Sequence, residues 1–125
     1  DRQTMPVLKP SPYVFPGLPE STHSMSSRMF VYNYLQANKV SLKSVQELNR
    51  RKKIIEVRAM IMYVLREHFS MMDYDIGDLL KKDRTTVCYH VKKTNERLGI
   101  GDPITMEFYN KALTILNRYP YEENH

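Results

Sequence analysis

The chain has 125 residues, 42% of them hydrophobic, and a formal net charge of +5. That length fits one compact domain, with or without an appended tail, and excludes a large multidomain assembly. A single cysteine, Cys88, excludes an internal disulfide, and the longest unbroken apolar run, residues 59–65, is too short to cross a bilayer.

Positive charge is concentrated in the middle of the chain. Residues 25–72 hold nine basic and three acidic residues, whereas residues 101–125 hold two basic and four acidic residues. This asymmetry favours a face that binds a polyanion. No zinc-ligand spacing, nucleophile–base pair or carboxylate pair is recognisable. We therefore expect a protein that is not an enzyme and has no cofactor, metal or small-molecule substrate.

The N-terminal segment, residues 1–24, holds five prolines, at positions 6, 10, 12, 16 and 19. Prolines at this density favour extended chain, so we expect an arm or linker. Its few apolar residues leave docking onto a partner or onto the domain as the alternative. A first helix is predicted over residues 26–37, and a short helix is predicted to start at Ser41.

A run of four cations preceded by an asparagine, Asn49-Arg50-Arg51-Lys52-Lys53, stands directly before the most apolar stretch. Such runs are usually solvated. An ordered basic loop at a fixed place is also able to enter a narrow minor groove. The stretch after it, residues 54–69, is predicted to be the core helix. Arg58 and Arg66 lie about two turns apart on it, either as ordinary surface arginines or as phosphate contacts.

Residues 73–99 read as a helix-turn-helix, in which a second helix lies in the DNA major groove. Asp83 is predicted to cap that second helix by accepting the N–H of Thr86. Helical spacing turns Val87, Val91, Thr94 and Leu98 inward. Gly77 is expected to let two helices cross closely, and Gly99 to end the second helix in a left-handed conformation. A solvated loop between two core helices is the plain alternative.

A closing amphipathic helix is predicted from Ile104 to about Tyr119, followed by a frayed tail, residues 120–125. The predicted fold class is therefore all-α. It comprises a Pro-rich arm (1–24), a compact helical domain containing a helix-turn-helix (25–119) and the tail.

The stretch over residues 50–98 resembles the C-terminal DNA-binding domain of the bacterial replication initiator DnaA. The resemblance rests on three segments: Arg58-Ala-Met-Ile-Met-Tyr-Val-Leu-Arg-Glu67, Asp75-Ile-Gly77 and Asp83-Arg-Thr-Thr-Val87. In that family a basic loop precedes a helix rich in Met, Ala and Tyr. An Ile-Gly pair follows, and Arg-Asp-His-Thr-Thr-Val opens the recognition helix. With a looser counterpart for the final helix, the resemblance covers residues from about 40 to 118.

The resemblance implies a role for each matching residue. Arg50 matches the loop arginine that reads the minor groove, with Lys52 at a neighbouring basic position. Arg58 and Arg66 match residues that hold the phosphate backbone.

The major-groove residues of the family match Asp83, Arg84, Thr85 and Thr86. Cys88 stands where the family places an apolar side chain against a thymine methyl group, or it is a plain packing cysteine. The predicted DNA-binding set is completed by Lys82 of the basic turn and by the outward-facing Tyr89 and Lys92 of the second helix.

Four departures indicate a different or relaxed target sequence. Arg84 replaces the signature histidine and favours guanine or a phosphate. The turn Lys81-Lys82 is one residue shorter than the family's Gly-Gly-Arg. Ala59 and Tyr74 stand where Gln and Pro are common. No phosphate-binding loop is present, so we expect an excised C-terminal domain or a free-standing phage or mobile-element protein.

The predicted function is therefore sequence-preferring binding of double-stranded DNA in replication initiation or its control, with other replication proteins as further partners. We expect a cytoplasmic, nucleoid-associated protein without a membrane partner. One alternative is a protein-interaction module that keeps the fold without reading DNA, which the acidic residues Asp73, Asp75 and Asp78 favour. Another is a helix-turn-helix transcriptional repressor, which dimerisation on a two-fold symmetric site would favour.

Overall fold

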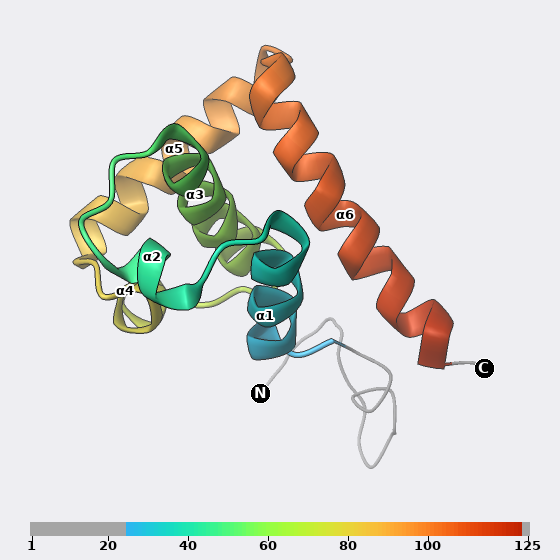
Figure 1. Cartoon of the computed structure of the whole chain (residues 1–125). Helices are drawn as coiled ribbons and strands as arrows, with labels where there is room; N and C mark the ends of the chain where they lie inside the picture. The colour runs from blue at the N-terminus through green and yellow to red at the C-terminus, as the bar shows by residue number, and fades with distance from the viewer. Residues whose placement is uncertain (1–24, 124–125) are drawn as a thin grey trace.

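The structure, a computed structural model, describes residues 25–123, which form six helices and no strand (Figure 1). The arm predicted over residues 1–24 and the last two residues lie outside the described residues. In order, the helices are α1 (Ser27–Asn38), α2 (Leu42–Gln46), α3 (Lys52–Glu67), α4 (Asp73–Leu80), α5 (Arg84–Gly99) and α6 (Pro103–Glu123). The predicted all-α fold class is confirmed.

Most of these helices are preceded by an N-capping side chain that accepts a hydrogen bond from a backbone N–H of the first turn. Ser26 and Ser41 cap α1 and α2 by accepting the backbone N–H of Met29 and Ser44, each at 3.1 Å. Asp102 does the same for α6, where its carboxylate accepts from Thr105 at 2.9 Å. Pro103 follows at the first helical position, where its missing N–H costs no hydrogen bond.

Helix α3 is the centre of the fold and packs against each of the other helices. Five of its apolar residues, Val57, Ile61, Met62, Val64 and Leu65, are fully buried. In Figure 1, α6 lies to the right of α3 and α4 to its lower left, while α5 crosses behind α3 and ends beside the start of α6. The α4–α5 pair is therefore held against the core by α3, as the predicted helix-turn-helix requires.

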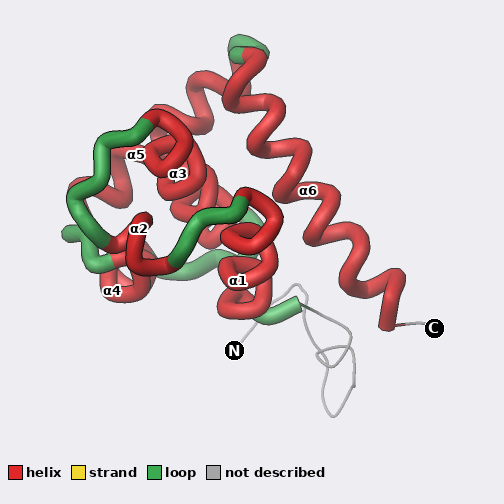
Figure 2. The backbone as a smooth tube through the Cα atoms, viewed as in Figure 1, coloured by secondary structure: helices red, strands yellow, loops and turns green. Residues whose placement is uncertain are grey.

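Helix α3 begins at Lys52, earlier than the predicted position 54, and ends at Glu67. Two of the four cations predicted to belong to the basic loop, Lys52 and Lys53, are thus in the first helical turn. The first N–H groups of a helix need no intrahelical partner, and lysine is a good helix former. The connection from α2 to α3 is therefore only residues 47–51, which run over the surface (Figure 2).

Two glycine predictions are corrected. Gly99 is the last residue of α5 itself, and Gly101, with φ of 73°, takes the left-handed conformation. The N–H groups of Gly101 and Asp102 donate to the carbonyls of Leu98 and Arg97, which is a Schellman motif. Gly77 faces the backbone of the α4–α5 turn rather than a crossing helix.

The closing helix is also longer than predicted. Helix α6 continues to Glu123, through the segment expected to fray from position 120. It runs along the flank of the domain beside α1 (Figure 1). Tyr34 of α1 donates to the Phe108 carbonyl at 3.0 Å, and Lys111 donates to the buried Asn38 side chain at 3.1 Å. Polar contacts thus add to the apolar packing between α1 and α6.

Candidate nucleic-acid interface

The start of α5 is open to solvent, as the sequence predicts. The Asp83 carboxylate accepts the backbone N–H of Thr86 at 2.7 Å and so caps the helix. That N–H, helped by the Thr86 hydroxyl, lowers the pKa of Asp83 below its ordinary value. Arg84 and Thr85 are exposed, and Thr86 is half-buried. The polar first turn of α5 is therefore available to a partner.

The two faces of α5 are divided as the helical spacing predicts. Val87 and Thr94 are buried, Val91 is half-buried against the core, and Leu98 is half-buried. The opposite face presents the exposed side chains of Cys88, Tyr89, Lys92, Lys93 and Glu96. The exposed face of α5 therefore presents polar, charged and apolar side chains together.

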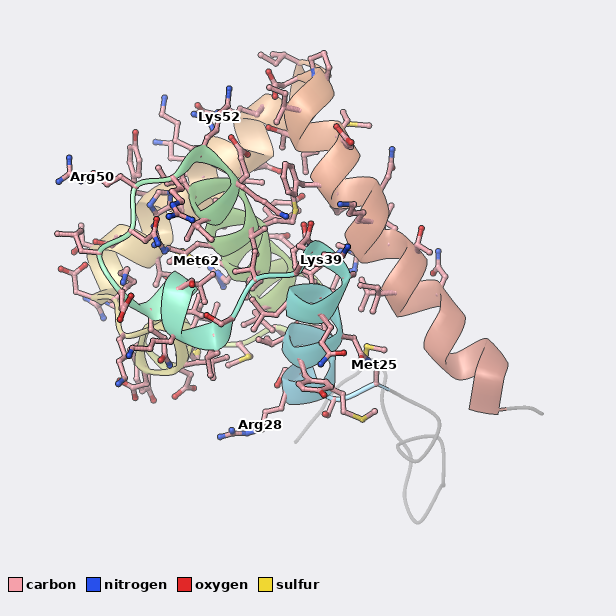
Figure 3. All side chains as sticks on the ribbon, in the orientation of Figure 1. Met25, Arg28, Lys39, Arg50, Lys52 and Met62 are labelled. Carbon is pink, nitrogen blue, oxygen red and sulfur yellow. The ribbon has the colours of Figure 1, made fainter. Side chains whose placement is uncertain are left out.

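The cationic segment before α3 is ordered by local hydrogen bonds. The Asn49 side chain accepts the backbone N–H of Arg51 at 3.0 Å, a turn that asparagine commonly makes. Arg50, Arg51, Lys52 and Lys53 are all exposed. Figure 3 shows Arg50 and Lys52 projecting outward from the loop and from the start of α3. We call residues 47–51 the basic loop from here on.

No acidic residue accompanies these cations in the first turn of α3, and the residue before the helix, Arg51, makes no side-chain cap. Cations at the positive end of a helix dipole are unfavourable, whereas anions are stabilised there. This end of α3 therefore favours an anion in addition to the Asp102 carboxylate, whose pKa is lowered mainly by Thr105 and to a smaller extent by Lys52.

Arg58 does not lie where the sequence placed it. Its side chain is only 7% exposed, and its guanidinium donates to three carbonyls. Nε donates to Val45 at 2.8 Å, and Nη2 to Glu47 and Asn49, both at 3.1 Å. The expectation of a surface arginine sharing a stripe with Arg66 is wrong, because the open carbonyls after α2 draw the guanidinium inward.

Lys82 is also turned inward. Its ammonium donates to the Gln46 carbonyl at 2.7 Å and lies 3.5 Å from the Glu47 carbonyl. Burial, and then the neighbouring Arg58, lower the pKa of Lys82. The sequence alone did not indicate this engagement of Lys82 with the end of α2.

Arg66 lies near the other end of α3 and is half-exposed. Its Nε lies 3.3 Å from the Asp73 carboxylate at the start of α4, an ion pair whose geometry falls short of a hydrogen bond. The remaining guanidinium nitrogens of Arg66 leave it able to contact a phosphate.

The sequence did not reveal Gln46, whose side-chain amide donates to the Leu79 carbonyl at 2.8 Å. This bond joins the end of α2 to the end of α4. No local pattern signals it, because the two residues are 33 positions apart. Arg51, Lys53 and Lys93 also belong to the exposed cationic surface, and the charge run itself was the signal for the first two.

The acidic residues near the motif lie beside a separate hollow. Asp75 and Asp78 of α4, with Leu42, Gln46 and Leu79, line a cavity of about 590 Å³ between α1, α2 and α4. Arg28 is also part of its lining. The carboxylates that would repel a phosphate are therefore grouped together on α4.

Across residues 25–123, the helices are too short or too polar for any of them to cross a membrane.

Comparison with known proteins gives two results. The sequence model described as "Bacterial dnaA protein helix-turn-helix" matches residues 31–94, which is half of the chain. The chromosomal replication initiator protein DnaA of Mycoplasma pneumoniae is 27% identical over 81 residues. That alignment covers 65% of this chain but 18% of the relative. The chain therefore spans less than a fifth of the length of the relative that it matches.

Proposed function

The chain belongs to the bacterial DnaA helix-turn-helix family, and from that premise we propose that it binds double-stranded DNA with sequence preference. The first turn of α5 enters the major groove and the basic loop enters the adjacent minor groove. The process it serves is replication initiation or its control.

The observation that carries this proposal is the common location of the two basic elements. The Glu47 carbonyl accepts hydrogen bonds from both Arg58 and Lys82. Arg58 also donates to the Asn49 carbonyl in the basic loop. Lys82 immediately precedes Asp83, the cap of α5. Arg50 and the first turn of α5 therefore lie on the same side of the domain. One duplex is able to meet both.

Affinity comes chiefly from the exposed cations around this surface. Lysines and arginines release condensed counterions when they neutralise phosphates, which makes binding fall steeply with salt. The start of α3, with Lys52 and Lys53 and no acidic residue, supplies N–H groups as well as charge to an approaching phosphate. Arg66 and Lys92 extend the phosphate contacts to either side.

Sequence preference comes from the open face of α5. Arg84 presents a guanidinium that pairs with the two major-groove acceptors of guanine, whereas Thr85 suits several base edges. Asp83 and Thr86 fix the orientation of this turn through their mutual hydrogen bond. Cys88 and Tyr89, further along the exposed face, supply apolar contact to thymine methyl groups.

The test is selection of bound duplexes from a random pool, followed by titration of a selected duplex and a scrambled one. Arg84→Ala and Thr85→Ala are each expected to cost about 1–3 kcal/mol on the selected duplex and little on the scrambled one. Lys52→Ala is expected to weaken both duplexes alike and to reduce the salt slope by about one phosphate contact.

Lys39→Ala provides the matched control. Lys39 is an exposed lysine at the end of α1, a helix that packs against α3 and α6. Its replacement removes the same charge and is expected to leave both affinities unchanged. Equal affinity of the parent protein for the selected and the scrambled duplex would contradict sequence-preferring binding.

A second candidate function is protein interaction without DNA reading. The grouping of Asp75 and Asp78 beside the cavity on α4 favours it, because these carboxylates suit a basic partner segment. A fluorescence-anisotropy titration at low salt separates the two functions. Absence of duplex binding at micromolar protein would favour the interaction module, whereas salt-dependent binding would favour the DNA-binding function.

A further inference from the structure

We propose that Arg58 and Lys82 are positioning residues, which lock the basic loop to the α4–α5 turn so that both engage DNA as one rigid unit. The inference rests on the proposed function, since it concerns how the two DNA-binding elements are held relative to each other. Neither residue touches DNA in this arrangement.

Arg58 fixes the basic loop by hydrogen bonds from α3. Its guanidinium donates to the carbonyls of Val45, Glu47 and Asn49, which span the end of α2 and most of the loop. A guanidinium is planar and presents its donors in a fixed fork, so the three carbonyls are held in one arrangement. Because Arg58 is itself buried on α3, the loop is anchored to the helix that packs against all the others.

Lys82 holds the same segment from the α4–α5 turn. Its ammonium donates to the Gln46 carbonyl at 2.7 Å, and the Gln46 side chain donates to the Leu79 carbonyl at 2.8 Å. The end of α2 and the end of α4 are thus joined by hydrogen bonds in both directions. The Glu47 carbonyl lies within reach of both cations.

The chemistry of the segment explains why two cations gather there. Helix α2 ends at Gln46, and its last carbonyls have no partner within the helix. The end of a helix also carries partial negative charge. Arg58 and Lys82 satisfy these oxygens, which offsets the repulsion between the two cations and the loss of water around them.

The result is a short fixed path between the two DNA-binding elements. Asn49, held by Arg58, is followed directly by Arg50, and Lys82 is followed directly by Asp83, the cap of α5. Fixing Arg50 before DNA arrives spares the complex the entropy of ordering a free loop. Loss of the Lys82 contact is therefore expected to reduce the contribution of Arg50 to DNA affinity. The contribution of the first turn of α5 to DNA affinity is expected to stay the same.

The experiment is a double-mutant cycle with the full chain and a selected duplex. In the parent protein, Arg50→Ala is expected to weaken binding about tenfold. In a Lys82→Met background, the same Arg50→Ala change is expected to weaken it by only about threefold or less. Thr85→Ala is expected to cost the same factor in both backgrounds.

Lys81→Met is the matched control, because it removes a lysine from the neighbouring position, where the side chain is exposed. In that background Arg50→Ala keeps its full effect. A second variant, Arg58→Lys, keeps the positive charge but loses the fork, and is expected to reduce the Arg50 effect as Lys82→Met does.

Amide hydrogen exchange in the absence of DNA supplies an independent readout. Residues 47–51 are expected to exchange faster in Lys82→Met than in Lys81→Met, with the core of α3 unchanged. An unaltered Arg50 effect together with unaltered exchange would overturn the positioning role. If the parent fails to distinguish selected from scrambled duplexes, the DNA function fails instead, and the exchange experiment still decides whether Lys82 holds the loop.

Discussion

The carbonyl oxygen of Lys82 lies where a β-carbon on Gly77 would have to go. The nearest atoms to such a β-carbon all belong to the backbone of the α4–α5 turn, which has no flexible end to move aside. The Lys82 N–H also donates to the Gly77 carbonyl at 2.9 Å. Gly77 is therefore required for the turn to pack on α4 and for Lys82 to reach the end of α2.

Replacement of Gly77 by alanine is expected to destabilise the protein. The added methyl group forces the turn backbone away from α4, and such overpacking typically costs about 1–3 kcal/mol. The free energy of unfolding, measured by urea denaturation, provides the test. DNA affinity is expected to fall as well, because the turn carries both Lys82 and the cap of α5.

Gly99→Ala is the matched control for this prediction. Gly99 is helical, and no atom lies within 4 Å of an added β-carbon. Alanine is the better helix former, so this variant is expected to gain about 0.5 kcal/mol in stability. Two glycine-to-alanine changes in one motif are thus expected to have opposite signs, and equal effects would show that the turn is not tightly packed on Gly77.

Lys81 takes the left-handed conformation, with φ of 57° and ψ of 46°, at the end of α4. A residue with a β-carbon is strained there, whereas glycine is not. Lys81→Gly is therefore expected to be more stable than Lys81→Ala by about 1 kcal/mol. The comparison of these two variants by thermal denaturation removes the effect of the lysine side chain itself. Equal stability would mean that the backbone here is relaxed.

From the lowered pKa of Asp83 we predict that the stability of the protein depends on pH in the acidic range. The Thr86 N–H and hydroxyl lower the pKa of Asp83 in the folded protein below the ordinary 3.8. The contribution of Asp83 to stability is thus complete above about pH 4 and is lost as the pH falls through the folded pKa. Asp83→Asn keeps a capping oxygen without the titration, so the difference in stability between parent and variant is expected to shrink with acid.

Asp83→Ala removes the cap as well as the charge, and it is expected to lower the melting temperature at neutral pH. Asp102, whose pKa is lowered by Thr105 in the same way, is present in all three proteins and cancels from the comparison. A melting temperature for Asp83→Ala equal to that of the parent would contradict the capping role.

Local patterns were sufficient to predict the parts of the fold that depend on neighbouring residues. The Asp83–Thr86 bond joins residues three apart, and the burial of Val87 and Thr94 follows from helical spacing. The start of α2 at Ser41 belongs to the same class. In each case the chemistry that forms the structure is contained within one or two helical turns.

The parts that the sequence did not predict depend on partners far along the chain. Arg58 was expected at the surface or on a phosphate, and nothing local indicated the partner of Lys82, whereas both residues donate to carbonyls at and after the end of α2. Gly99 and Gly101 both suit a helix end, and the sequence did not show which of the two takes the left-handed conformation. The contacts that Arg50, Arg84 and Thr85 make with DNA remain predictions, since exposure alone does not identify a partner.

His90 provides the last prediction, in a pH range well separated from that of Asp83. Its ring is half-buried on α5, and burial, followed by the charges of Arg58 and Arg97, lowers its pKa below the ordinary 6.5. The unfolded chain therefore takes up a proton before the folded protein does, and stability is expected to fall as the pH drops from about 6.5 through the folded pKa.

His68 has a pKa lowered mainly by burial, and its titration changes the stability in the same direction. In urea denaturation between about pH 5 and pH 7.5, His90→Gln and His68→Gln are each expected to remove part of this loss. A parent protein whose stability is flat across that range would mean that both rings reach water freely when protonated, and that the two arginines do not act on His90.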